Sequence, residues 1–281
     1  MKVLMRFPGG LAKTFTMSYD DGVWQDVRLI DIMKKNGVKG TFNINSGRWK
    51  RHENSDDETK ITFAKAKEIY LDNGMEIATH AVNHPFLDQL PSAGAAYEVL
   101  ADRIEIEKNL GIIARGHAYP YGAWSEDVIK TLRQCGIVYA RTTVSTGKFT
   151  IPETSDEWLA LPATAKHTDP KLFELGEKFI NSAVKYRSMM FYLWGHSYEF
   201  DEYHDNNWDL IEKFLEFIGN RDDIWYATNI EIYDYIQAFN SLQFSATCDR
   251  VYNPTCTKVW FETDKGIVSV DPGETVDLNC S

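Results

Sequence analysis

Short apolar runs alternate with amphipathic stretches over most of this chain, and this alternation constrains the fold more than any other feature. The apolar runs predict β-strands at 14–19, 38–44, 75–80, 113–119, 137–142, 189–196 and 224–228. Helical patterns follow them near residues 25–36, 62–72, 92–110, 125–135, 170–184, 206–218 and 229–240. Because neighbouring parallel strands need a crossover, usually a helix, these repeated βα units predict a parallel sheet.

Residues that start and stop helices support these boundaries. Ser92 and Ser125 are expected to cap helix N-termini, and Pro170 is expected to be the first residue of its helix. Glycines occur where four of the helices should end, at Gly37, Gly74, Gly111 and Gly136.

Repeated βα units fit either a barrel or a large open sheet, and the positions of the polar motifs decide between them. Asp20 and Asp21 follow the first predicted strand, His80 ends the third, Tyr121 follows the fourth, and His196 ends the sixth. Several strands thus deliver polar groups to one end of the sheet, as in barrels with an active site at the C-terminal face. An open sheet would gather them mainly at one switch point. We therefore predict an α/β barrel.

The pattern changes after residue 240. Residues 257–263 and 266–270 read as two strands joined by a turn, and a third apolar run lies at 275–278. We predict a barrel over residues 1–240 and a small β-rich C-terminal extension over 241–281, which is too short to fold alone.

The composition limits the partners of the chain. A net charge of −11 without any basic run argues against a nucleic-acid-binding surface. No apolar stretch approaches the ~20 residues that span a bilayer, so no membrane association is expected. The first residues are interrupted too soon to form a secretory signal, so a cytoplasmic location is expected. A homo-oligomer remains possible.

Three of the four cysteines lie near the C-terminal end, at Cys248, Cys256 and Cys280. Free thiols are the expected state in a reducing cytosol, and a disulfide between Cys248 and Cys256 is the alternative. No short CxxC pair occurs, which argues against a cysteine zinc site.

Two carboxylates and three histidines form the most informative pattern. His80 and His84 are four residues apart, and together with one aspartate they would leave an open metal position, as in hydrolytic zinc sites. A second aspartate and His196 would then remain for proton transfer. Of the other histidines, His117 is expected to be structural or to support the site, while His52, His167 and His204 lie in polar segments where surface exposure is expected.

These motifs, in this order, resemble the polysaccharide deacetylase family, also called the NodB homology or carbohydrate esterase family 4 group. The resemblance covers roughly residues 14–200 and rests on Asp-Asp-Gly at 20–22, HxxxH at 80–84, Pro-Tyr-Gly at 120–122 and the run ending at His196. It implies a distorted (β/α)7 barrel.

The resemblance also implies a role for each motif residue. Asp21, His80 and His84 would hold a divalent metal, with Zn²⁺ the first choice and Co²⁺, Ni²⁺ or Fe²⁺ compatible with the same ligands. Asp20 would be the general base, His196 the general acid, and the backbone N–H of Tyr121 an oxyanion donor. Four nearby residues would support the site or contact the substrate: Glu199, Pro120, Trp194 and Trp124.

The chain departs from the family pattern in two places. The family usually has an arginine, which tunes the base, at the position of Ala118, and Arg115 and Arg141 are the possible substitutes. The family's Asp-Trp motif has only Asp156-Glu157-Trp158 as a candidate. Glu199, three residues after His196, would either orient that histidine or cap the following segment.

The leading hypothesis is a metal-dependent hydrolase that removes N-acetyl groups from an amino sugar or short glycan. A hydrolase of a non-sugar amide, imide or formamide on the same barrel is the second hypothesis, and a catalytically inactive sugar-binding protein is the third. A purely structural role for these aspartates and histidines is the remaining alternative.

Overall fold

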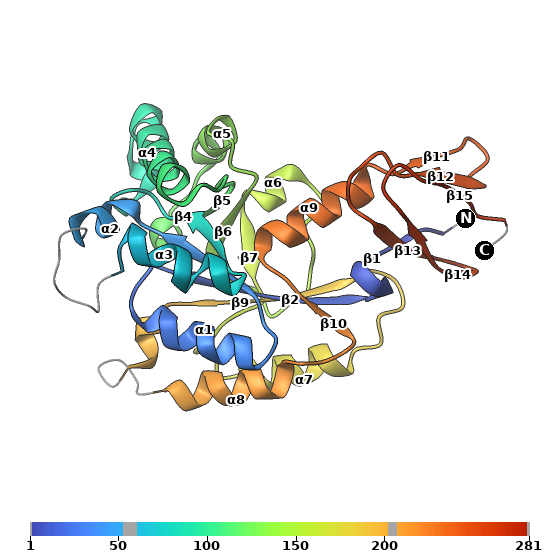
Figure 1. Cartoon of the computed structure of the whole chain (residues 1–281), viewed down its shortest axis with the longest axis horizontal. Coiled ribbons are helices and arrows are strands. Elements are labelled where there is room, and N and C mark those ends of the chain that lie inside the picture. Colours follow the sequence, from blue (N-terminus) through green and yellow to red (C-terminus); the bar gives the residue numbers. More distant parts are fainter. Residues whose placement is uncertain (1, 53–60, 202–206, 280–281) are drawn as a thin grey trace.

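The computed structural model describes residues 2–52, 61–201 and 207–279. Its main sheet is parallel throughout and has the strand order β7-β6-β5-β4-β3-β2-β9-β8, with β10 paired to β2 (Figure 1). The strands of this sheet are β2 (Lys13–Asp20), β3 (Gly40–Ile44), β4 (Glu76–Thr79), β5 (Gly116–Ala118), β6 (Tyr139–Ser145), β7 (Leu161–Ala163), β8 (Ala165–Lys166), β9 (Met189–Gly195) and β10 (Ile224–Tyr226).

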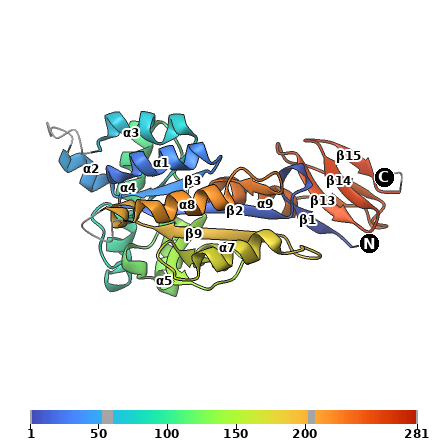
Figure 2. The same ribbon diagram turned by 90° about the horizontal axis from the view of Figure 1, so that it is seen from below.

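Helices surround this sheet on its outer side (Figures 1 and 2). They are α1 (Gln25–Lys35), α2 (Ser46–His52), α3 (Phe63–Ile69), α4 (Ser92–Leu110), α5 (Glu126–Gln134), α6 (Ser155–Trp158), α7 (Leu172–Asn181), α8 (Trp208–Ile218) and α9 (Asn229–Asn240). Every predicted helix and strand of the barrel is present. The predicted α/β class and distorted (β/α)7 barrel are confirmed.

One barrel strand was not predicted. The segment 161–166 pairs with β6 through β7 and with β9 through β8, so it links the two ends of the sheet. Only Thr164 separates the two pairings, and its N–H donates to the carbonyl of Tyr192 at 2.8 Å. This strand is too short to show an alternating pattern, and Pro162 is unusual within a strand, so the sequence does not indicate it. The predicted strand at 224–228 forms β10, which pairs with β2 alone.

The helix boundaries depend on local capping. Ser125 caps α5 as predicted and accepts a hydrogen bond from the N–H of Val128. The four predicted glycine stops all have left-handed φ angles between 66° and 74°. Two predictions were wrong: Ser92 is the first residue of α4, behind Pro91 at the cap, and Pro170 lies before α7, which begins at Leu172.

Strand β2 is buried on both faces, although polar and apolar residues alternate along it. All eight of its residues are buried, and the aromatic rings of Phe15 and Phe191 pack at a centroid distance of 5.5 Å. The helices cover this core from outside, with Phe214 of α8 against Phe15. A rigid strand with this packing holds the aspartates at its C-terminal end in place.

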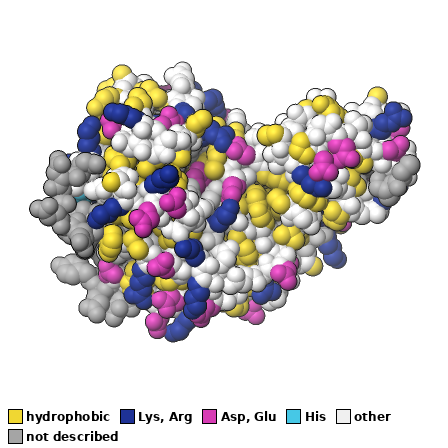
Figure 3. Space-filling view, viewed as in Figure 1, with side chains coloured by type: hydrophobic (Ala, Val, Ile, Leu, Met, Phe, Trp, Pro, Cys, Tyr) yellow, Lys and Arg dark blue, Asp and Glu magenta, His cyan; other side chains and the backbone are white. Residues whose placement is uncertain are grey.

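The C-terminal residues form a small β appendage, as predicted. One sheet has the order β1-β13-β14, formed by Leu4–Arg6, Val259–Thr263 and Gly266–Val270, and the other joins β11 (Gln243–Phe244), β12 (Arg250–Tyr252) and β15 (Thr275–Asp277). Figure 3 shows hydrophobic side chains at the narrow waist between barrel and appendage. Because β1 pairs with β13, the start of the chain is part of this appendage. The division at residue 240 stays a prediction.

Cys135 is buried, and Cys248 and Cys256 are exposed free thiols, so the alternative disulfide between the latter two is not formed. Cys280 lies outside the described residues. Within the described ranges, no helix has the length and apolar character that a membrane span requires.

Candidate active site

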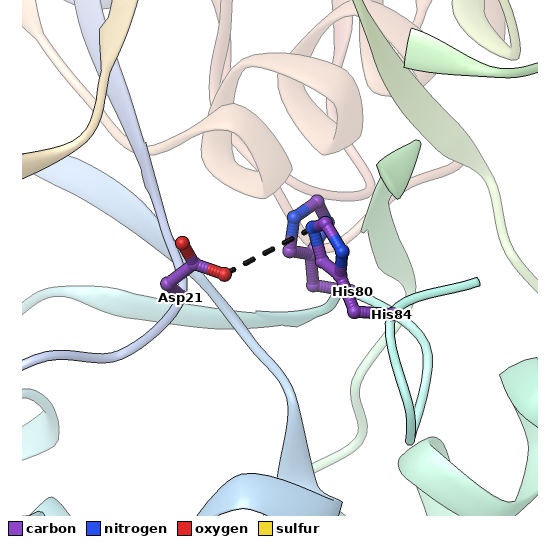
Figure 4. A group of neighbouring side chains, drawn as sticks. All are labelled: Asp21, His80 and His84. Atoms are coloured by element: carbon purple, nitrogen blue, oxygen red, sulfur yellow. Dashed lines mark ion pairs between the residues drawn. The ribbon is translucent and has the colours of Figure 1, made fainter. Parts of the chain in front are cut away.

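The three predicted metal ligands meet at the C-terminal end of the barrel. Asp21 directly follows β2, and His80 and His84 follow β4. One ligand atom from each residue lies within 4.8 Å of the other two. In Figure 4 the Asp21 carboxylate points toward both imidazoles, and its Oδ1 is 4.0 Å from Nε2 of His84. The three side chains form a cluster that a single ion could join.

The backbone around this cluster is strained. Six non-glycine residues in the described part of the chain have positive φ, and four of them lie here: Asp21 (79°), Ala81 (61°), His84 (59°) and Tyr121 (58°). Such conformations are uncommon for residues with a side chain, and they persist where the surrounding structure enforces them. Their concentration at one place indicates a functional site.

His80 is held in one orientation. Its Nδ1 donates to the carbonyl of Ala118 at 2.7 Å, which leaves the Nε2 lone pair free to face Asp21 and His84. Its backbone N–H donates to Asp102 at 2.8 Å, and the N–H of Ser46 donates to the same carboxylate at 2.7 Å. Burial raises the pKa of Asp102 to about 7. Asp102, which belongs to α4, thus fixes the backbone at the start of the HxxxH segment.

The residues present fit a divalent metal. Oδ1 of Asp21 is buried and has no hydrogen-bond partner among the described residues, which a bound cation would supply. Burial also lowers the pKa values of His80 and His84, which favours the neutral imidazoles that bind metals. An Asp-His-His set with a carbonyl bond behind one histidine is typical of zinc sites.

Asp20 lies beside the cluster with both oxygens held by hydrogen bonds. Asn43 donates to Oδ1 at 2.8 Å, and the buried guanidinium of Arg141 donates to Oδ2. Burial alone would raise the pKa of Asp20. The charges of Arg141, His80 and His196 outweigh burial and lower it to about 2. Asp20 is therefore ionised at neutral pH.

His196 faces Asp20 from the end of β9. Its Nε2 is 3.8 Å from Oδ2 of Asp20, and its Nδ1 is 3.4 Å from Glu199. Burial opposes a charged imidazole, but Glu199 and Asp20 outweigh it and raise the pKa of His196. His196 therefore holds a proton more readily than an ordinary histidine does. Glu199 is itself held by Lys166, whose ammonium donates at 2.7 Å.

His167 was predicted to be exposed, and this prediction was wrong. The side chain is fully buried, with Nε2 at 3.1 Å from Glu199 and Nδ1 at 3.0 Å from the hydroxyl of Tyr19. A Cβ atom at Gly195 would lie 1.9 Å from its Nδ1, so the glycine makes room for this ring. Gly195, directly before His196, is the one sequence signal that could have indicated that the His167 ring packs against β9.

Asp26 ties the aspartate loop to the loop of His196. Its carboxylate accepts hydrogen bonds from Ser197 (2.6 Å), Tyr70 (2.7 Å) and the N–H of Val23 (3.2 Å). It is fully buried, and this burial raises its pKa to about 7. The sequence pattern did not indicate a role for Asp26, because a single aspartate in the first turn of a helix is common there for electrostatic reasons.

Three of the other predicted site residues lie near the cluster. The ring of Tyr121 is 58% exposed and packs edge-on against His84, with centroids 4.4 Å apart. Pro120 precedes it and is buried. Trp194 is also buried and packs beneath the guanidinium of Arg141. Trp124 is 40% exposed and lines a separate hollow between α5 and α6.

Several other candidates do not reach Asp20 or His196. Arg115 pairs with Asp234 instead, and Asp156 pairs with Arg133 at the surface. His117 is buried and contacts Thr79. The remaining two histidines differ: His52 is half-buried at the end of α2, and His204 lies outside the described residues.

The sequence model of the polysaccharide deacetylase family matches residues 9–140. Over these residues, a little under half of the chain, the sequence carries the pattern of the polysaccharide deacetylase family. A chitin deacetylase of Arthroderma benhamiae is 30% identical over 126 residues, which are 43% of this chain and 31% of that protein. The match thus spans about a third of that relative's length.

Solved structures share the polysaccharide deacetylase fold. A Mycobacterium smegmatis protein classed with the polysaccharide deacetylases has a TM-score of 0.61 at 17% identity, covering 84% of this chain and 94% of that one. A carbohydrate esterase family 4 pseudoenzyme from Bacillus anthracis has a TM-score of 0.50 at 16% identity, covering 81% and 67%. At these identities the likeness establishes the fold alone.

Proposed function

We propose that the protein is a metal-dependent hydrolase that removes N-acetyl groups from an amino sugar or short glycan. One observation carries the proposal: an Asp-His-His cluster, an ionised aspartate and a histidine of raised pKa lie together at one face. The family match over residues 9–140 supports the same chemistry.

Asp21, His80 and His84 would hold the metal, with zinc the first choice. When bound, such an ion polarises the acyl carbonyl and lowers the pKa of water, which makes attack feasible near neutral pH. Asp20 would take the proton from the attacking water, because the guanidinium of Arg141 keeps its carboxylate ionised.

His196 would protonate the departing amine. An amine anion is a very poor leaving group, so amide cleavage needs an acid within reach, and imidazolium serves near neutrality. Glu199 contacts Nδ1 of His196, and Lys166 donates a hydrogen bond to Glu199. The backbone N–H of Tyr121, on the strained turn beside His84, would donate to the oxyanion.

Acetate release from N-acetylglucosamine oligomers, measured with and without chelator, tests this proposal. About one metal per chain together with chelator-sensitive acetate release supports deacetylation. Bound metal without acetate release would direct attention to non-sugar amides, or to an inactive protein like the Bacillus anthracis relative. Absence of metal binding would overturn the proposed mechanism.

A further inference from the structure

An arginine that the proposed mechanism does not use lies beside the Asp-His-His cluster. Arg48 belongs to α2, and its guanidinium is 3.9 Å from Oδ1 of Asp21. Its side chain is 37% exposed, and it forms no hydrogen bond with any described residue through its guanidinium. The five donors of this group are thus available to a ligand.

A cavity of about 420 Å³ opens next to this guanidinium. Its described lining combines the loop after Asp21 with residues of α2 and one residue just before α3: Gly22, Val23, Trp24, Gln25, Arg48, His52 and Ile61. Trp24 adds a partly exposed indole, 40% accessible, to one wall.

Metal binding would leave Arg48 without a counter-charge. Asp21 is the only described acid within 4.0 Å of its guanidinium, and an ion held by Asp21, His80 and His84 would neutralise that carboxylate. A guanidinium beside a divalent cation is unfavourable unless an anion joins them. A carboxylate suits this position because its two oxygens match the fork of an arginine.

We propose that this cavity is a subsite for a carboxylate on the substrate, and that Arg48 selects acylated amino sugars that carry an acidic group. The inference rests on the proposed function, because it places the acidic group next to the acyl group that is cleaved. Trp24 would pack against the apolar face of the sugar ring that bears the carboxylate.

Calorimetric titration of the zinc-loaded protein tests the subsite without turnover. The ligands are two carboxylated amino sugars, 2-acetamido-2-deoxyglucuronic acid and N-acetylmuramic acid, each compared with its uncharged methyl ester. N-acetylglucosamine serves as the ligand without a carboxyl group. We expect at least one acid to bind about tenfold more tightly than its ester, as a charge-assisted bond to arginine would give.

Two variants separate Arg48 from the general charge of the site. Arg48→Gln should reduce the preference for acid over ester to less than about twofold and keep the metal. Lys50→Gln removes a charge from the same helix, where Lys50 pairs with Glu105 on the exposed side, and should keep the preference.

Three outcomes would overturn the subsite: equal binding of acids and esters by the wild-type protein, an unchanged preference in Arg48→Gln, or loss of metal from Arg48→Gln. The last result would show that Arg48 only holds Asp21. Acetate release from uncharged oligomers is measured in parallel. Its absence, with an Arg48-dependent preference intact, would refute the deacetylase proposal and keep the carboxylate subsite.

Discussion

Arg141 and Asp20 form a buried ion pair across the barrel, from β6 to β2. Both side chains are almost fully inaccessible, and Trp194 packs under the guanidinium at 4.7 Å from its ring centroid. Ala118 on β5 is the position where the sequence comparison expected an arginine, and Arg141 lies beside it on β6. Arg141 thus supplies a positive charge to Asp20, the proposed base, from a different strand.

Replacing Asp20 should separate catalysis from metal binding. Asp20→Asn removes the proposed base and leaves Asp21, His80 and His84 intact, so we expect near-normal metal content with acetate release reduced at least about 100-fold. His80→Ala should lose metal and activity together. Elemental analysis and acetate assays on both variants check this prediction. Near-normal turnover by Asp20→Asn would show that another group is the base.

Removing Arg141 should shift the acid side of the pH–rate profile. The guanidinium lowers the pKa of Asp20, so in Arg141→Gln this pKa rises and the carboxylate becomes protonated at a higher pH. Activity should therefore fall off at a higher pH than in the wild type. Breaking a buried ion pair should also cost about 3–5 kcal/mol of stability. Arg141→Lys, which keeps the charge, should show a smaller shift.

Removing Glu199 should move the alkaline side of the profile instead. Glu199 helps to raise the pKa of His196, so Glu199→Gln lowers that pKa and the histidine loses its proton at a lower pH. Amide hydrolysis should decline at a correspondingly lower pH. Aryl ester hydrolysis, whose leaving group needs little protonation, serves as the control and should change less. Equal losses on both substrates would instead indicate damage to the fold.

Asp26 should make stability depend on pH. Its pKa is about 7 in the folded protein against 3.8 as the ordinary value, so the native state binds more protons between these limits. The free energy of unfolding therefore receives a contribution that falls as pH rises from about 4 to 7, by a few kcal/mol in total. Asp26→Asn removes this titration, so its stability relative to the wild type should improve from pH 5 to pH 8.

Urea unfolding at both pH values measures this difference. Asp209→Asn is a suitable control, because the Asp209 side chain is 79% exposed on α8. A constant difference between Asp26→Asn and the wild type at the two pH values would contradict a buried, protonated Asp26.

The sequence predicted the barrel and the Asp-His-His cluster because both depend on local signals: alternating βα patterns, and polar residues directly after strands. It did not predict contacts that depend on how side chains from different strands pack against one another. The strand at 161–166 is too short to show a period, and the burial of His167 depends on the room left by Gly195. The choice of Arg141 over Arg115 needed the register that aligns Ala118 with Arg141.

The left-handed residues around the cluster set a limit on engineering this protein. Glycine adopts positive φ without the penalty of about 1–2 kcal/mol that Asp21 or His84 carries. A library screened for heat resistance alone would therefore accumulate glycine at these proposed ligand positions and give more stable proteins that lack the Asp-His-His cluster. Any directed evolution of this barrel needs a second screen for the proposed metal binding.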